Sequence, residues 1–110
     1  MRRVILESPF APTETATVAD NELYARRAVR DALLRGEAPL ASHLLYTQPG
    51  VLVDTVPEER RQGIDAGHAW LAFADALVVY GDLGFSAGMT TGIERAQMTG
   101  IPVEVRFLDA

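Results

Sequence analysis

Apolar residues fall into four short runs that predict four β-strands. Residues 4–6 form a run that stops at a segment with two prolines, which cannot donate hydrogen bonds to a strand ladder. Residues 76–80 are apolar or aromatic at every position, as is typical of a central parallel strand covered on both faces. Residues 39–45 form another apolar run. In the run at residues 103–108, Val103, Val105 and Phe107 alternate with the charged residues Glu104 and Arg106. This last strand is expected at an edge or an interface.

Three stretches between these runs predict helices. The first carries small and apolar residues at helical spacing over residues 25–33, with Asp20 or Asn21 as its N-cap. The second begins at Pro57, because the fixed φ of proline suits the first helical position. The third carries its apolar stripe over residues 89–96. Strands and helices therefore alternate along the chain.

This alternation predicts a single three-layer α/β domain over residues 1–110. We expect a parallel sheet of about four to five strands in the order 2-1-3-4, with right-handed crossovers and helices on both faces. Such a fold is Rossmann-like, and specifically flavodoxin-like. At 110 residues the chain is too short for a two-domain enzyme.

Composition excludes several classes of function. The chain has no cysteine, so disulfides, thiolate zinc sites, iron–sulfur clusters and cysteine nucleophiles are excluded. A net charge of -5 argues against a nucleic acid polymer as partner, because such binders carry basic surfaces. No apolar run approaches the ~20 residues that span a bilayer. We expect a cytoplasmic protein that binds neither membrane nor nucleic acid polymer.

In a sheet of this order, ligands bind beyond the carboxyl ends of the first and third strands, where the strand order reverses. The loops at residues 7–12 and 81–88 converge there, and the second is rich in glycine, with Ser86 as a candidate helix cap. A helix start favours a phosphate or carboxylate through its unpaired N–H groups. Those groups belong to Ala87, Gly88 and Met89. A tight structural turn would explain the same glycines.

Four acids are predicted near this cleft, where they could hold ribose hydroxyls or act at an anomeric carbon. These acids are Glu7, Asp65, Asp82 and Glu94. His43 lies near the end of the second strand and His68 on the second helix, and a hydrogen-bonded structural role is favoured for both. No spacing of histidines and carboxylates forms a metal site, and no cofactor is expected.

The order of several short motifs resembles that of the nucleoside 2-deoxyribosyltransferase superfamily, which includes deoxynucleotide N-hydrolases. These motifs are Glu7-Ser8-Pro9-Phe10, the strand start at residues 74–79, and residues 86–96. Three other segments resemble a branch of small bacterial and phage proteins within the superfamily, namely residues 24–27, 36–43 and 50–54. The resemblance covers nearly the whole chain and implies a homodimer or a higher homo-oligomer.

The resemblance also implies a nucleoside or nucleotide ligand. Ser86 and Gly88 would hold its phosphate or hydroxymethyl end, and residues 8–10 would surround its base and sugar. Enzymes of the superfamily use a glutamate on the helix after the glycine-rich loop as the nucleophile at C1′, and the matching position here is Gly92. The carboxylate nearest to the position of their second acid is Asp65.

Two functions follow as hypotheses. In the first, the protein binds a nucleoside or nucleotide without cleaving it, because Gly92 stands at the nucleophile position. In the second, it is an N-glycoside hydrolase or deoxyribosyltransferase that uses Asp65, Asp82 or Glu94. A purely structural role is a third. The predicted ligand-binding residues are Glu7, Ser8, Pro9, Phe10, His43, Asp82, Ser86, Ala87, Gly88 and Met89.

Overall fold

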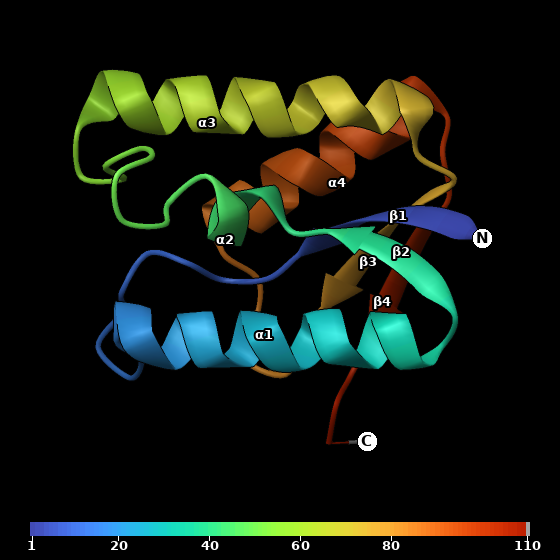
Figure 1. Cartoon of the computed structure of the whole chain (residues 1–110), viewed down its shortest axis with the longest axis horizontal. Coiled ribbons are helices and arrows are strands. Elements are labelled where there is room, and N and C mark those ends of the chain that lie inside the picture. The colour runs from blue at the N-terminus through green and yellow to red at the C-terminus, as the bar shows by residue number, and fades with distance from the viewer. Residues whose placement is uncertain (110) are drawn as a thin grey trace.

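The structure is a computed structural model that describes residues 1–109. Strands and helices alternate along this part of the chain (Figure 1). The elements are β1 (Arg2–Glu7), α1 (Val18–Leu34), β2 (Glu37–Leu40), α2 (Ser42–Leu45), α3 (Pro57–Ala69), the 3-10 helix η1 (Trp70–Phe73), β3 (Ala76–Tyr80), α4 (Ala87–Thr99) and β4 (Val103–Arg106). Among the helices of residues 1–109, none is both long and apolar enough to cross a membrane.

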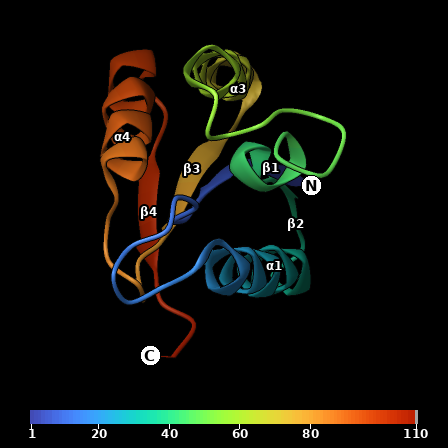
Figure 2. The ribbon, with the colours of Figure 1, turned by 90° about the vertical axis from the view of Figure 1, so that its left-hand side faces the viewer.

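The strands form one parallel, four-stranded sheet in the order β2-β1-β3-β4, which confirms the predicted topology. α1 covers one face of this sheet, and α3 and α4 cover the other (Figures 1 and 2). The chain therefore has the predicted three-layer α/β fold. β1 and β3 are neighbours, with Glu7 beside Val79 at the end of their shared ladder. The loops that follow these two strands consequently open at the same end of the sheet.

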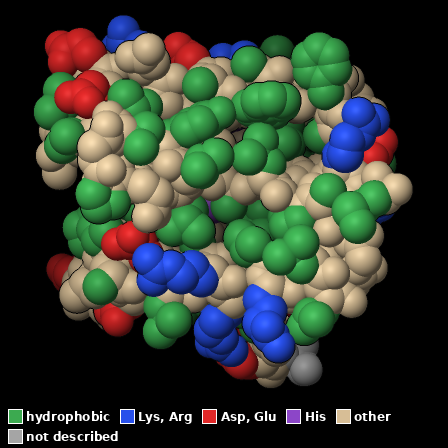
Figure 3. Space-filling model, in the orientation of Figure 1, with side chains coloured by type: hydrophobic (Ala, Val, Ile, Leu, Met, Phe, Trp, Pro, Cys, Tyr) green, Lys and Arg blue, Asp and Glu red, His purple; other side chains and the backbone are tan. Residues whose placement is uncertain are grey.

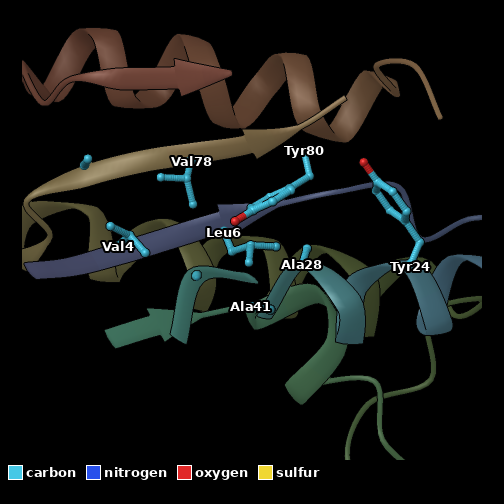
Figure 4. Packing of buried hydrophobic residues seen from close by; sticks show 9 residues of the cluster. Val4, Leu6, Tyr24, Ala28, Ala41, Val78 and Tyr80 are labelled. Atoms are coloured by element: carbon cyan, nitrogen blue, oxygen red, sulfur yellow. The ribbon is translucent and has the colours of Figure 1, made fainter. Parts of the chain in front are cut away.

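Buried side chains form one cluster on each face of the sheet. The cluster on the α1 face includes Val4, Leu6, Tyr24, Ala28, Val78 and Tyr80 (Figure 4). The cluster on the opposite face includes Ile5, Leu77, Val79, Met89 and Ala96. All five residues of β3 are buried, as predicted for a central strand. Because side chains alternate along a strand, Glu7 of β1 lies on the same face as Ile5, toward α4.

The start of α1 differs from the prediction. Thr17 is the N-cap: its hydroxyl accepts from the Asp20 N–H at 3.1 Å, and the Asp20 carboxylate accepts from the Thr17 N–H at 2.8 Å. Asn21 is buried and donates to the carbonyls of Phe10 and Ala11, at 3.0 and 3.1 Å. The prediction of Asp20 or Asn21 as N-cap is therefore wrong, because Asn21 instead holds the loop that follows β1.

The second strand is shorter than predicted, because the apolar run at residues 39–45 divides between two elements. β2 ends at Leu40, and two N–H groups of the following residues turn back to the carbonyl of Ala41, at 3.0 and 3.1 Å. These bonds close the short helix α2, so the prediction of a strand is wrong for the second half of the run. His43 consequently lies on a helix and not at the end of a strand.

β4 also ends earlier than predicted, at Arg106. The N–H groups of Leu108 and Asp109 donate to the carboxylate of Asp82 at 2.9 and 3.1 Å and do not continue a ladder. The hydroxyl of Tyr24 donates to the same carboxylate. Asp82 therefore joins α1, the loop after β3 and the C-terminal segment.

A buried ion pair joins the two outer strands across the α1 face of the sheet. The Arg106 guanidinium of β4 donates to both carboxylate oxygens of Glu37 of β2, each at 2.7 Å. Arg106 lowers the pKa of Glu37 through these bonds. The Tyr80 hydroxyl accepts from Arg106 at 3.2 Å and donates to Asp31 of α1 at 2.7 Å. The network thus connects the sheet to α1 beside β4.

Candidate functional site

A cleft of about 230 Å³ opens at the carboxyl end of β1. Its walls are the loop after β1, α2, the segment between α2 and α3, α3 itself, and the start of α4. The space-filling view shows hydrophobic side chains across the middle of one face of the molecule and arginines gathered at its lower edge, over α1 (Figure 3). The cleft has a largely apolar lining, so a few polar groups determine what it can hold.

Glu7 ends β1 and reaches into this cleft from below α4. A Cβ placed at Gly92 of α4 would lie 2.7 Å from Glu7 Oε1 and 2.9 Å from Glu7 Cδ. The Glu7 carboxyl therefore occupies the space that a side chain at Gly92 would need. Burial raises the pKa of Glu7 to about 8, and no cation or hydrogen-bond donor within residues 1–109 offsets the lost hydration. At neutral pH this carboxyl is mostly protonated and can donate a proton.

Ser8 and His43 form a polar pair at the same end of the sheet. Ser8 Oγ lies 2.7 Å from His43 Nε2, and this hydrogen bond joins the end of β1 to α2. Ser8 is buried, and burial lowers the pKa of His43 to about 4, so the imidazole is neutral at pH 7. A hydroxyl and a neutral imidazole can each donate or accept a hydrogen bond, which suits them to the recognition of hydroxyl groups.

The start of α4 supplies backbone donors to the cleft. Ser86 is the N-cap, as predicted, and its Oγ accepts from the Met89 N–H at 3.2 Å. Met89 therefore does not offer a free N–H group, which corrects the prediction of three free donors. The N–H groups of Ala87 and Gly88 remain at the positive end of the helix dipole. A Cβ at Gly88 would meet only Ser86 Oγ, at 3.9 Å, so the space in front of Gly88 is open.

Sequence reasoning missed the wall between α2 and α3. The residues of this wall are Ser42, Tyr46, Thr47, Leu52, Asp54, Glu59, Arg60, Gly63, Ile64 and His68. Asp54 and Arg60 form an ion pair at 2.7 Å, and His68 Nδ1 is buried with no hydrogen-bond partner within residues 1–109. The sheet order could have identified the segment after the second strand as part of the cleft. β2 is the neighbour of β1, so this segment begins beside the loop that follows β1. The described residues contain no group of three histidines or carboxylates that could hold a metal ion.

Eight of the predicted ligand-binding residues line the cleft, namely Glu7, Ser8, Phe10, His43, Ser86, Ala87, Gly88 and Met89. Pro9 is buried and lies outside the lining. Asp82 does not line it either, because its carboxylate is held by Tyr24 and the C-terminal segment. Asp65 and Glu94 are exposed and also lie outside the lining. None of the three predicted catalytic carboxylates is therefore placed in the cleft, whereas Glu7 is.

Comparisons with known proteins agree with this architecture. A search of the curated proteins finds no match. Among solved structures, a 2-deoxyribosyltransferase from the psychrotolerant bacterium Bacillus psychrosaccharolyticus matches with a TM-score of 0.64 and 20% sequence identity, covering 96% of this chain and 72% of that chain. The two proteins therefore share a fold. A family model described as "Domain of unknown function (DUF7768)" matches residues 2–106, and the chain belongs to this family.

Proposed function

We propose that the cleft binds a nucleoside or a nucleotide. The observation that carries this proposal is the position of the cleft between the carboxyl end of β1 and the start of α4, in the fold of a 2-deoxyribosyltransferase. Donors from α4 lie on one side of it and the Ser8–His43 pair on another. A mostly apolar pocket with a few convergent polar groups is the usual form of a small-molecule site. The net charge of -5 also favours a small ligand over a nucleic acid polymer.

The polar groups suggest how such a ligand lies. Its phosphate or hydroxymethyl end meets the N–H groups of Ala87 and Gly88, where the helix dipole favours an oxygen with negative charge. The Ser8–His43 pair is suited to a sugar hydroxyl, because each group can donate or accept. Phe10 lines the cleft and supplies aromatic surface against which a base can stack.

Cleavage of the N-glycosidic bond is a second candidate function, and the position of Glu7 favours it. Helix α4 has no side chain at Gly92, but a carboxyl from β1 fills the space there. A carboxyl group in a sugar-binding cleft can act as acid, base or nucleophile at the anomeric carbon. Asp65 and Glu94 are less suited to this role, because both are exposed outside the cleft lining.

We also propose that the protein is a homodimer or a higher homo-oligomer. Large hydrophobic side chains are half exposed at the β4 end of the molecule, and these are Leu83, Phe85, Val105 and Phe107. Burial against a second copy would remove this apolar surface from water.

The first experiment is a calorimetric titration with 2′-deoxynucleosides, ribonucleosides and their 5′-monophosphates, followed by chromatography of every mixture. Binding with the ligand recovered intact supports a binding protein. Release of the free base supports N-glycoside cleavage. Failure of every compound to bind at millimolar concentration would reject the proposed ligand class.

A charge at the start of α4 tests where the anionic end of the ligand lies. Gly88→Asp places a carboxylate in the open space before the helix, and we expect the affinity for a 5′-monophosphate to fall at least tenfold by calorimetry. Thr90→Asp adds the same charge to the same helix at an exposed residue outside the cleft lining, and serves as the matched control. Equal affinities of the two variants for the 5′-monophosphate would show that its phosphate does not bind at the start of α4.

A further inference from the structure

Glu7 stands apart from the other carboxyl groups of residues 1–109 that are not exposed to solvent. Asp82 is held by three donors, Glu37 by Arg106, and Asp54 by Arg60. Glu7 instead lies at the cleft with no ion pair and no hydrogen bond to any of residues 1–109. Even a partly buried carboxyl without a partner costs free energy, and such groups cluster at functional sites, so a role at the ligand cleft is favoured.

Two local features hold Glu7 in this position. Its backbone is fixed in the parallel ladder opposite Val79 of β3, which directs its side chain to the α4 face. The side chain then fits only because residue 92 is glycine, since a Cβ there would lie within 3 Å of the Glu7 carboxyl. The carboxyl of Glu7, at the end of β1, therefore packs against the backbone of α4 at Gly92, where the helix has no side chain.

The loss of hydration on burial keeps this carboxyl uncharged. The titratable side chains that share the cleft lining with Glu7 come from α2, the segment after it, and α3. They are His43, Tyr46, Asp54, Glu59, Arg60 and His68. His43 is neutral, and Arg60 is already paired with Asp54 at 2.7 Å. The residues that α4 places in the lining carry no titratable side chain. Glu7 therefore keeps its proton at neutral pH, with a pKa raised to about 8.

We propose that Glu7 is the general acid that protonates the leaving base when a nucleoside or nucleotide bound in the cleft is hydrolysed. This inference rests on the proposed function, because it requires that ligand in that cleft. It replaces Asp65, Asp82 and Glu94 as the catalytic carboxyl. It also requires no nucleophile on α4.

The proposed step balances as a hydrolysis. The C1′–N bond breaks, its electron pair leaves with the base, and the base takes the proton from the Glu7 carboxyl. A water oxygen forms the new bond to C1′, and the water gives one proton back to the Glu7 carboxylate. The products are the free base and the sugar with a hydroxyl group at C1′. Glu7 ends in the protonation state in which it began.

The test measures the release of free base from 2′-deoxynucleosides and their 5′-monophosphates by chromatography, with binding measured in parallel by calorimetry. Glu7→Gln keeps the shape of the side chain and removes the acidic proton, so we expect turnover to fall about 10²- to 10⁴-fold with affinity changed less than about threefold. Asp65→Asn and Glu94→Gln are matched controls and should keep wild-type turnover. Gly92→Ala is a second variant, and should lower turnover because it displaces the Glu7 carboxyl.

A pH profile separates an acid from a merely structural residue. Wild-type turnover should decline as pH rises through about 8, because Glu7 then loses the proton that it must donate. Wild-type turnover in Glu7→Gln overturns the inference. Binding of the ligands by the wild-type protein without release of base also overturns it, but leaves the proposed binding function in place. Failure of every ligand to bind rejects both.

Discussion

At the scale of single residues, Glu7 and His43 are both uncharged because of burial, and they respond to pH in opposite directions. Between about pH 6.5 and 8, an unfolded chain has an ionised Glu7, near its ordinary pKa of 4.5, whereas the folded protein keeps the proton until about pH 8. The folded state binds more protons there, so rising pH lowers the free energy of unfolding. Between pH 4.5 and 6.5 the lowered pKa of His43 has the opposite effect and offsets this loss.

We therefore expect the free energy of unfolding to be nearly constant from about pH 5 to 6.5 and to decline by about 2 kcal/mol from there toward pH 8. Urea denaturation at a series of pH values measures this dependence. In Glu7→Gln the decline above pH 6.5 should disappear. A decline of the same size in that variant would show that another group is responsible.

The sequence indicates which residues stand near the cleft better than it indicates what each one does. Glu7, Ser8 and Ser86 follow from the sheet order, because they lie at the end of β1 or in the loop that follows its neighbour β3. Asp82 stands at an equivalent place but is held by a tyrosine on α1 and by two N–H groups of the C-terminal segment. These partners are distant in sequence, so no local pattern predicts them. The pKa of Glu7 likewise depends on burial, which the sequence does not specify at a strand end.

At the scale of elements, the sequence predicts a strand most reliably where both faces of the strand are buried. β3 is covered on both faces and reads as an unbroken apolar run. The run at residues 39–45 is mostly apolar but contains one turn of helix, because a short apolar segment has no period that separates strand from helix. The hydrogen bonds to the Ala41 carbonyl decide the outcome. That helix then carries His43 to the cleft.

The contact between α2 and α3 gives a prediction at this scale. A Cβ at Gly67 of α3 would overlap Ser42 Oγ and lie 3.1 Å from Ser42 Cβ, so Gly67→Ala forces the two helices apart. We expect it to lower the free energy of unfolding by about 1–3 kcal/mol in urea denaturation, despite the higher helix propensity of alanine. Gly63→Ala on the same helix would meet only the flexible end of Leu52, at 3.2 Å, and should cost less. Equal costs would contradict this account of the α2–α3 contact.

At the scale of the whole molecule, the β4 end is the surface most suited to contact a second copy. Phe85 and Phe107 both pack over Gly81, where a Cβ would lie 2.8 Å from one ring and 3.2 Å from the other. About half of each phenylalanine is still exposed. The other edge of the sheet is formed by the short strand β2, whose Pro39 has no N–H to offer a further strand. Association by extension of the sheet is therefore disfavoured at β2.

We expect Phe107→Arg to convert the proposed oligomer to monomers, because it places a charge within the apolar surface. Light scattering coupled to size-exclusion chromatography measures the mass of each species. Met98→Arg, at an 83% exposed residue of α4, is the matched control and should leave the mass unchanged. An unchanged mass for Phe107→Arg would place the interface elsewhere.

The shared space of Glu7 and Gly92 also limits how the sequence of this family can diverge. A larger residue at position 92 cannot be accepted while position 7 carries a long side chain, because the two would overlap. Substitutions at the two positions should therefore be coupled, so that relatives with a bulky residue or an acid on α4 carry a small residue at the end of β1. A carboxyl group in this part of the cleft can therefore come from position 7 of β1 or from position 92 of α4. A change from one to the other requires substitutions at both positions.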